Sequence, residues 1–159
     1  MGGHNYLDPN LIKGLIQKLK GTIVECNTAY PGKRMTSSDH WETIKAHGFT
    51  EIAPCDIMDE EGEIEIPVHG GEHLQNKNIV GSHIQNYDSM LVLSHFKGHA
   101  IGGFGGALKN MSIGVASSNG KAWIHSGVSK AFSGYFEEIG DGKFLNRGLK
   151  NCEIKKYEY

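Results

Sequence analysis

A glycine-rich segment near the middle of the chain gathers most of the residue types that could do chemistry. An apolar stretch and two histidines precede it and a lysine and an asparagine follow it; the residues are 90–93, His95, His99, Gly102, Gly103, Gly105, Gly106, Lys109 and Asn110. Glycine permits positive φ and a close approach of the backbone to a ligand. Where a strand gives way to a helix, unpaired N–H groups and the positive end of the helix dipole face the same space. The pattern predicts that this segment binds a small cofactor or an anionic ligand.

Lys109 stands where a helix is expected to begin, so its ammonium group can fold back toward an anion held by the glycine segment. The spacing matches neither the P-loop pattern nor the dinucleotide-binding glycine pattern, which argues against a nucleotide. The alternative is a close strand-to-helix turn that carries an exposed lysine.

Histidines are the candidate acids, bases and metal ligands, because imidazole titrates near neutral pH and binds metals. We consider His95, His99 and His125 in these roles, with a hydrogen-bonded structural histidine as the alternative for each. Two other segments carry ligand-type residues, 69–73 and 56–61. Adjacent glycines in the first, and a spacing in the second that fits no calcium loop, favour a flexible turn and a solvated acidic turn.

Composition excludes several classes of partner. The 159 residues include 16 basic and 18 acidic side chains, so the formal charge of −2 gives no field that would attract nucleic acid or an anionic membrane. No apolar run approaches the ~20 residues of a membrane span. Three widely spaced cysteines without a Cys-x-x-Cys pair argue against a disulfide framework. We expect a cytoplasmic protein with a small-molecule ligand or a redox partner.

The elements that must position these residues alternate between helix and strand. Helices are expected from Asp8-Pro9 to Gly21, from a cap at Ser38 or Asp39 to Gly48, and over 107–113. Strands are expected over 22–26, 51–55 and 63–68, over the ambiguous 79–84, and over 88–93, with a short strand or turn at 121–124 that places His125. The continuous apolar run in 88–93 is typical of a central parallel strand buried on both faces. This order predicts an α/β fold, a three-layer Rossmann-like domain with a mostly parallel central sheet.

Several stretches of the chain closely resemble the family called domain of unknown function 362. The stretches are 3–7, 25–30, 56–59, 68–73, 92–99, 102–110 and 120–125, so the resemblance covers about residues 2–126. Members of that family are often described as uncharacterised iron–sulfur-centre proteins. The resemblance implies a redox or iron–sulfur-associated domain over 1–126, followed by a divergent tail over 127–159. Longer relatives have a first strand before the position of Gly2 and a ferredoxin-like cysteine run that binds a 4Fe–4S cluster. Neither is present here, so we expect an incomplete, truncated version of the domain.

A more distant resemblance is to the nickel-pincer lactate racemases. His99, the glycine segment, Lys109 and His125 are similar to them in order and spacing. The resemblance implies that Lys109 carries the pincer cofactor covalently, that His125 is a nickel ligand and that His99 lies close to the cofactor. Beside the first hypothesis, a redox or iron–sulfur-associated domain, the second hypothesis is therefore an enzyme acting on a small hydroxy acid. The third is an inactive fragment, whose unpaired sheet edge would favour self-association.

Overall fold

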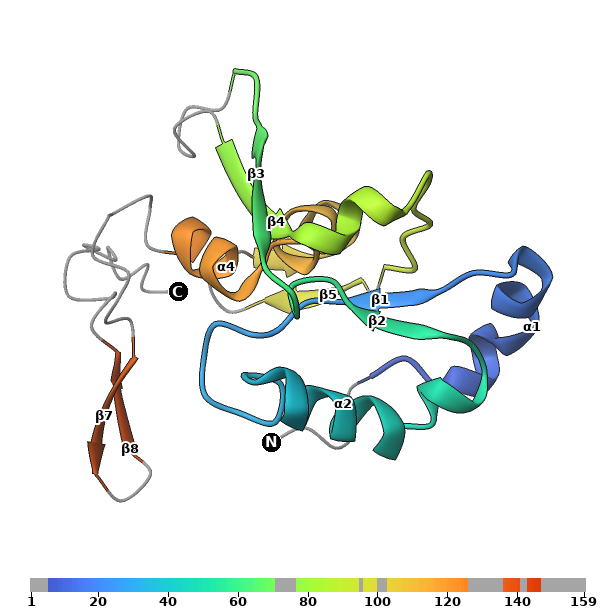
Figure 1. Ribbon diagram of the computed structural model, residues 1–159, viewed down its shortest axis with the longest axis horizontal. Helices are drawn as coiled ribbons and strands as arrows, with labels where there is room; N and C mark the ends of the chain where they lie inside the picture. Colours follow the sequence, from blue (N-terminus) through green and yellow to red (C-terminus); the bar gives the residue numbers. More distant parts are fainter. Residues whose placement is uncertain are drawn as a thin grey trace.

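The computed structural model describes residues 6–70, 77–94, 96–99, 103–125, 136–140 and 143–146 (Figure 1). The helical elements are α1 Pro9–Leu19, α2 Ser37–Ala46, the 3₁₀-helices η1 Phe49–Glu51 and η2 Ser82–Asn86, α3 Ala107–Lys109, the π-helix η3 Asn110–Gly114 and α4 Ser118–His125. The strands are β1 Ile23–Glu25, β2 Cys55–Ile57, β3 Glu63–Pro67, β4 Lys77–Gly81, β5 Lys97–His99, β6 Gly103–Gly105, β7 Phe136–Gly140 and β8 Lys143–Asn146. Mixed helix and strand confirm the α/β class.

The first helix begins and ends close to its predicted positions. The carboxylate of Asp8 accepts a hydrogen bond from the backbone N–H of Asn10 at 2.9 Å, and Pro9 occupies the first turn. Lys20, at φ 52°, takes the left-handed position that ends the helix, immediately before Gly21.

The second helix has a different cap from the one predicted. Thr36 caps α2, and its hydroxyl accepts from the N–H of Asp39 at 3.2 Å, so neither Ser38 nor Asp39 is the cap. Four candidate residues of the capping type follow one another here, from Thr36 to Asp39. The first of them takes the extended backbone that the cap position requires.

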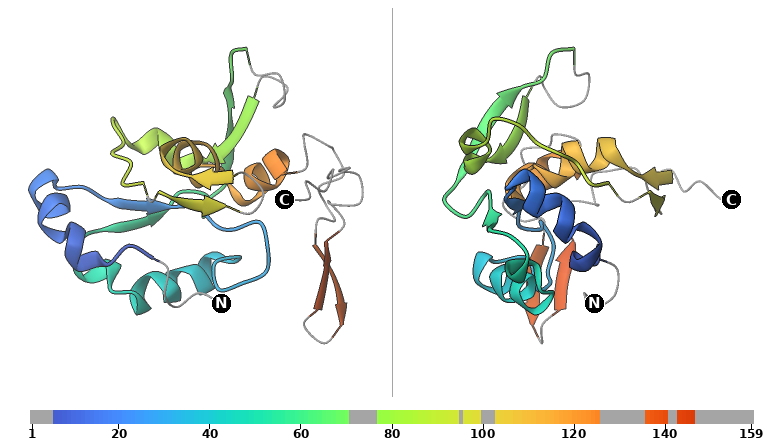
Figure 2. Two further views of the ribbon diagram at one scale, coloured as in Figure 1. Left: turned by 180° about the vertical axis from the view of Figure 1, so that it is seen from behind. Right: turned by 90° about the vertical axis from the view of Figure 1, so that its right-hand side faces the viewer.

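The parallel part of the fold is a single pair of strands. β1 and β2 are parallel, with Ile23 opposite Cys55 and Glu25 opposite Ile57. The described strands otherwise form three antiparallel pairs, β3–β4, β5–β6 and β7–β8, so a mostly parallel central sheet is not found among them. Figures 1 and 2 show α2 on one side of the β1–β2 pair and β4 with α4 on the other.

The predicted central strand over 88–93 is wrong. Residues 88–94 have no strand structure, and the side chains of Leu91 and Leu93 are 60% and 38% exposed. A continuous apolar run has no period of its own, so it does not distinguish a buried strand from another segment. Strand pairing depends on a neighbouring edge, which the run itself does not encode.

Two further strand predictions are also corrected. Residues 49–51 form the 3₁₀-helix η1, so the strand predicted over 51–55 begins only at Cys55, after Pro54. Residues 121–124 lie within the helix α4 rather than in a strand. The half-exposed strand predicted over 63–68 is confirmed as β3, whose residues alternate between exposed and half-buried. The ambiguous segment 79–84 divides between β4 and η2.

The core lies where the strand ends meet α4. Cys26, Met58, Val80 and Val115 are buried against one another, between 0% and 7% exposed. Two glycines permit this packing. A Cβ on Gly81 would lie 2.5 Å from the carbonyl carbon of Met58, and one on Gly120 would collide with the carbonyl oxygen of Ile79. Within the described ranges, no helix combines the length and the apolar character needed to cross a bilayer.

Replacing Gly120 with alanine should therefore destabilise the protein by about 2 kcal/mol or more, because the backbone oxygen that meets the new methyl group belongs to β4 and cannot rotate away. Gly14→Ala in α1 is the matched control. Its Cβ would have no atom within 4 Å, so a gain of about 0.5–1 kcal/mol is expected from helix propensity. Urea-unfolding midpoints measure both effects, and equal midpoints for the two variants would contradict the close packing of α4 on β4.

Candidate functional site

The glycine segment forms the second strand of a hairpin. β5 and β6 pair antiparallel, with Lys97 opposite Gly105 and His99 opposite Gly103. The segment therefore does not follow a central strand as a loop, although it does lead into a helix, whose N-cap is Gly106. Gly103 has φ 75°, in the left-handed region that favours glycine.

Two lysine side chains meet over Gly105. The position that a Cβ would occupy on this residue lies 3.7 Å from Cγ of Lys97 and 3.8 Å from Cδ of Lys109. Partial burial, and then the nearby charge of Lys97, lower the pKa of Lys109 below its ordinary value. The missing side chain thus leaves room for two cationic stems on one face of the hairpin. Lys97 and Lys109 are called the lysine pair below.

The other face of the hairpin is aromatic. Phe104 pairs with Gly98, so it points away from the face that carries Lys97. Its ring lies 5.7 Å from that of Phe96, and the two side chains are 59% and 80% exposed. The hairpin is therefore a ribbon with one cationic and one aromatic face.

The predicted site residues fall into two groups. The first group is contiguous along β6, α3 and the start of η3: Gly103, Gly105, Gly106, Lys109 and Asn110. The Asn110 N–H donates to the Gly106 carbonyl at 3.1 Å.

The three histidines are the second group. His125 is the exposed last residue of α4. His95, Gly102 and the side chain of His99 lie outside the described residues, as does the 71–73 part of the segment 69–73. The convergence of Lys109, His99 and His125 therefore stays a prediction.

A polar network that sequence reasoning missed occupies the carboxyl ends of β1 and β2. Asp59 accepts from the backbone N–H of Asn27 and of Ser118, both at 2.8 Å, and so joins the ends of both strands to the start of α4. The side chain of Asn27 donates to Ser37 at 3.0 Å and lies 3.1 Å from Nδ1 of the buried His40. The signal that could have found this network is the prediction of parallel strands, because the carboxyl ends of parallel strands meet at one edge of a sheet.

A buried amine and a buried thiol lie beside this network. Lys121 donates from Nζ to the carbonyl of Ala116 at 2.6 Å, and burial lowers its pKa. Cys26 donates to the carbonyl of Val115 at 3.4 Å, and burial raises the pKa of its thiol to about 12. Both groups are therefore biased toward their neutral forms.

Cys26 and Cys55 are not placed to share an iron–sulfur cluster. A cluster needs several thiolates close together. Cys26 is held as a thiol just past β1, whereas Cys55 begins β2 at the opposite end of the ladder, since it pairs with Ile23. Cys152 lies outside the described residues, and the described part of the chain holds no group of three histidine, cysteine or acidic residues placed to bind a metal ion.

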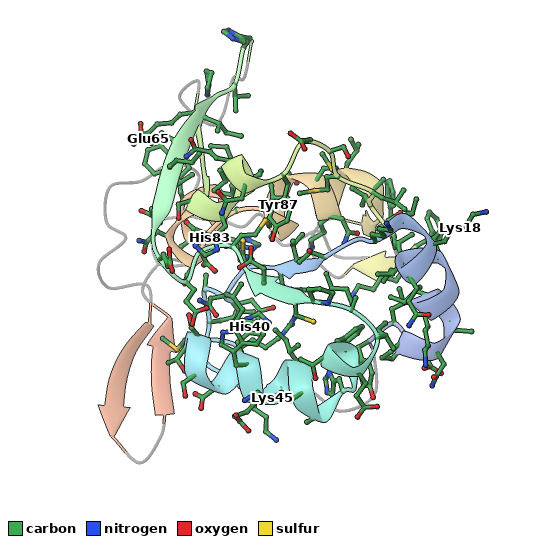
Figure 3. All side chains as sticks on the ribbon, turned by 45° about the vertical axis from the view of Figure 1, so that its right-hand side comes forward. Lys18, His40, Lys45, Glu65, His83 and Tyr87 are labelled. Atoms are coloured by element: carbon green, nitrogen blue, oxygen red, sulfur yellow. The ribbon has the colours of Figure 1, made fainter. Side chains whose placement is uncertain are left out.

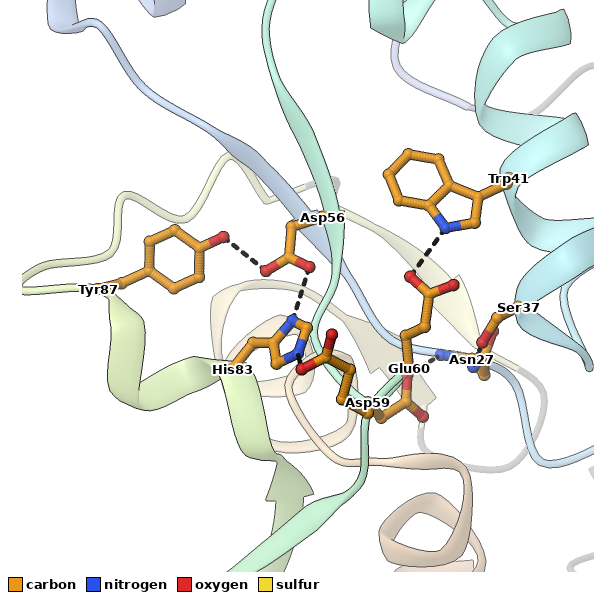
Figure 4. Close-up of polar contacts among 9 residues, drawn as sticks. Asn27, Ser37, Trp41, Asp56, Asp59, Glu60, His83 and Tyr87 are labelled. Atoms are coloured by element: carbon orange, nitrogen blue, oxygen red, sulfur yellow. Dashed lines mark hydrogen bonds and ion pairs between the residues drawn. The ribbon is translucent and has the colours of Figure 1, made fainter.

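The acidic segment 56–61 holds a histidine rather than forming only a solvated turn. Nδ1 of His83 lies 2.8 Å from Oδ1 of Asp56, and the Tyr87 hydroxyl donates to Oδ2 of the same carboxylate at 2.6 Å (Figure 4). Nε2 of His83 lies 3.2 Å from Oε2 of Glu61. The hydrogen bond to Asp56 is the main cause that raises the pKa of His83. Figure 3 shows His83 with Tyr87 on one side of the β1–β2 pair and His40 on the other.

Because of His40, the free energy of unfolding should decrease as the pH is lowered through mild acid. Burial lowers its pKa from 6.5 to about 4, so between these values the unfolded chain binds a proton that the folded chain does not. The contribution of His40 to the free energy of unfolding is complete above pH 6.5. It is lost as the pH falls toward 4, an effect of about 2–3 kcal/mol. Urea unfolding across this range measures the slope. His40→Gln should flatten the slope, and His47→Gln, at a half-buried ring stacked on Tyr6, should not. Equal slopes in both variants would contradict the assignment.

Comparison with known proteins places the chain in a family. The family model described as Domain of unknown function (DUF362) matches residues 2–147. This confirms the resemblance found in the sequence, and the match continues beyond residue 126. No curated protein and no solved structure matches the chain. Because the match spans most of the chain, this protein belongs to the family Domain of unknown function (DUF362).

Proposed function

We propose that this protein binds a small anionic ligand or cofactor at the lysine pair, as a redox or iron–sulfur-associated member of its family. One observation carries the proposal: two lysine stems share the space over Gly105, on the same face of a short hairpin. Like charges held together repel, and an anion between them converts that repulsion into two attractions. The ligand would therefore be a carboxylate or a phosphate.

The surroundings of the pair support a small ligand. Gly103, Gly105 and Gly106 place no side chains beside the two lysine stems, and Gly105 and Gly106 are themselves buried. Lys109 is half-buried, so its charge is screened less by solvent than that of a fully exposed lysine. An anion at this position can thus receive charge-assisted hydrogen bonds from both ammonium groups.

A second candidate is a nickel-pincer-type enzyme acting on a small hydroxy acid. The observation that favours it is the lowered pKa of Lys109, since a larger neutral fraction makes its amine more nucleophilic. Lys109 would then hold the organic cofactor, with His125 and His99 beside it. The cofactor would supply the redox chemistry of the reaction, and the chain would supply the attachment point and the imidazoles.

Anion binding should depend on both lysines of the pair, whereas loss of a positive charge elsewhere should not affect it. Calorimetric titration of the full chain with inorganic phosphate and with succinate, at low ionic strength, is expected to show roughly tenfold weaker binding for Lys97→Gln and for Lys109→Gln. Lys45→Gln, which removes an equal charge from a surface ion pair with Glu42 on α2, is the control. Unchanged affinity in both variants of the lysine pair, or an equal loss in the control, would refute the site.

Intact-mass and metal analysis of the protein as isolated separates the two candidates. The second predicts added mass on Lys109 together with nickel, and both should be lost in Lys109→Ala. Unmodified Lys109 without nickel would rule out the second candidate and leave the anion titration to decide the first.

A further inference from the structure

His83 joins two carboxylates of the acidic segment 56–61. Asp56 lies on β2, whereas Glu61 lies in the turn 58–62 that follows it, and each contacts a different ring nitrogen of His83. The backbone N–H of His83 also donates to the carbonyl of Met58 at 3.0 Å. The Ser82 N–H donates to the carbonyl of Gly62, also at 3.0 Å, so backbone bonds hold both ends of the turn to η2 and the imidazole adds a side-chain contact between them.

The two contacts differ in what they require of the imidazole. Both ring nitrogens donate hydrogen bonds only in the protonated form, because neutral imidazole carries a single N–H. Asp56 is held in place by Tyr87 and is 18% exposed, whereas the Glu61 side chain is 80% exposed and free to turn into solvent. Loss of the proton should therefore cost the contact with Glu61 and leave the contact with Asp56.

We propose that His83 and Glu61 form a pH-dependent clasp, which holds the Glu61 side of the turn 58–62 against η2 when the imidazole is protonated and releases the Glu61 side chain when the imidazole is neutral. Among the described residues, Asp56 and Glu61 are the charged groups that face the ring, and Tyr87 reaches it only through Asp56. Both carboxylates favour the protonated ring, which raises the pKa of His83. The clasp is thus closed in mild acid and opens as the pH rises through that raised value.

Residues next to Glu61 in the turn contact other elements, so release of the Glu61 side chain should affect those contacts. Glu60, next to the clasp residue, accepts from the indole N–H of Trp41 on α2 at 2.9 Å. Asp59, one residue earlier, joins β1 to α4. Opening of the clasp loosens the Glu60 side of the turn while Asp59 stays held by two backbone N–H groups. The Trp41 indole therefore reports the state of the clasp.

The test follows His83 and Trp41 in the same pH titration of the full chain by NMR. The expected result is that the Trp41 indole resonance shifts with the midpoint of the His83 ring, and that amide exchange in the turn, after correction for its intrinsic pH dependence, rises roughly fivefold once the ring is neutral. Glu61→Gln should lower the His83 midpoint and remove the linked Trp41 shift. Glu51→Gln, which removes an exposed charge from η1, should change neither.

Two outcomes would overturn the clasp. One is a Trp41 resonance that does not follow the His83 midpoint in the wild-type chain. The other is an unchanged His83 midpoint in Glu61→Gln while the variant keeps the native near-ultraviolet circular dichroism. His83→Gln, whose amide can still donate to Asp56, provides a second variant and should show no pH-linked shift of Trp41 between mild acid and mild base.

Discussion

The carboxylate of Asp59 is the interaction on which the arrangement of the other elements depends. It follows β2 and accepts from the backbone at the end of β1 and at the start of α4, both at 2.8 Å. A two-stranded parallel pair of three residues each has few hydrogen bonds of its own. Two charge-assisted bonds to backbone N–H groups therefore fix the relative positions of both strands and the helix. The buried core of Cys26, Met58, Val80 and Val115 packs directly against this junction.

The polar groups around this junction divide the molecule into a scaffold and a ligand-binding ribbon. On the scaffold, His40 and Lys121 are buried and biased toward their neutral forms, which suits groups that organise a core. The hairpin β5–β6 instead displays its aromatic rings at the surface, and its Lys97 lies with the half-buried Lys109 of α3 on the other face. Binding functions are commonly carried by such projecting segments on a rigid frame. Cys26 and Cys55, the cysteines among the described residues, belong to the scaffold, which is why these two do not offer a cluster site.

Local signals gave the elements that depend on local interactions. The Asp8-Pro9 pair placed α1, the period of two placed β3, and the glycines preceded a helical stretch at 107–114. The site residues along β6 and α3 were found because they are contiguous. The networks of Asp59 and of His83 were missed, since their partners lie 22 to 59 residues apart in the chain. No spacing rule links residues at such separations.

By itself, the sequence determined the α/β class, the family and the glycine-lysine segment, because composition, caps and contiguous motifs are properties of the chain. Only the tertiary structure decided that 88–93 is not a central strand, that the glycine segment is half of a hairpin, and that Lys97 joins Lys109. The physical reason is that strand pairing and side-chain convergence depend on which edges and faces meet. That choice is made by the packing of the whole chain, and short apolar or glycine-rich stretches are compatible with several outcomes.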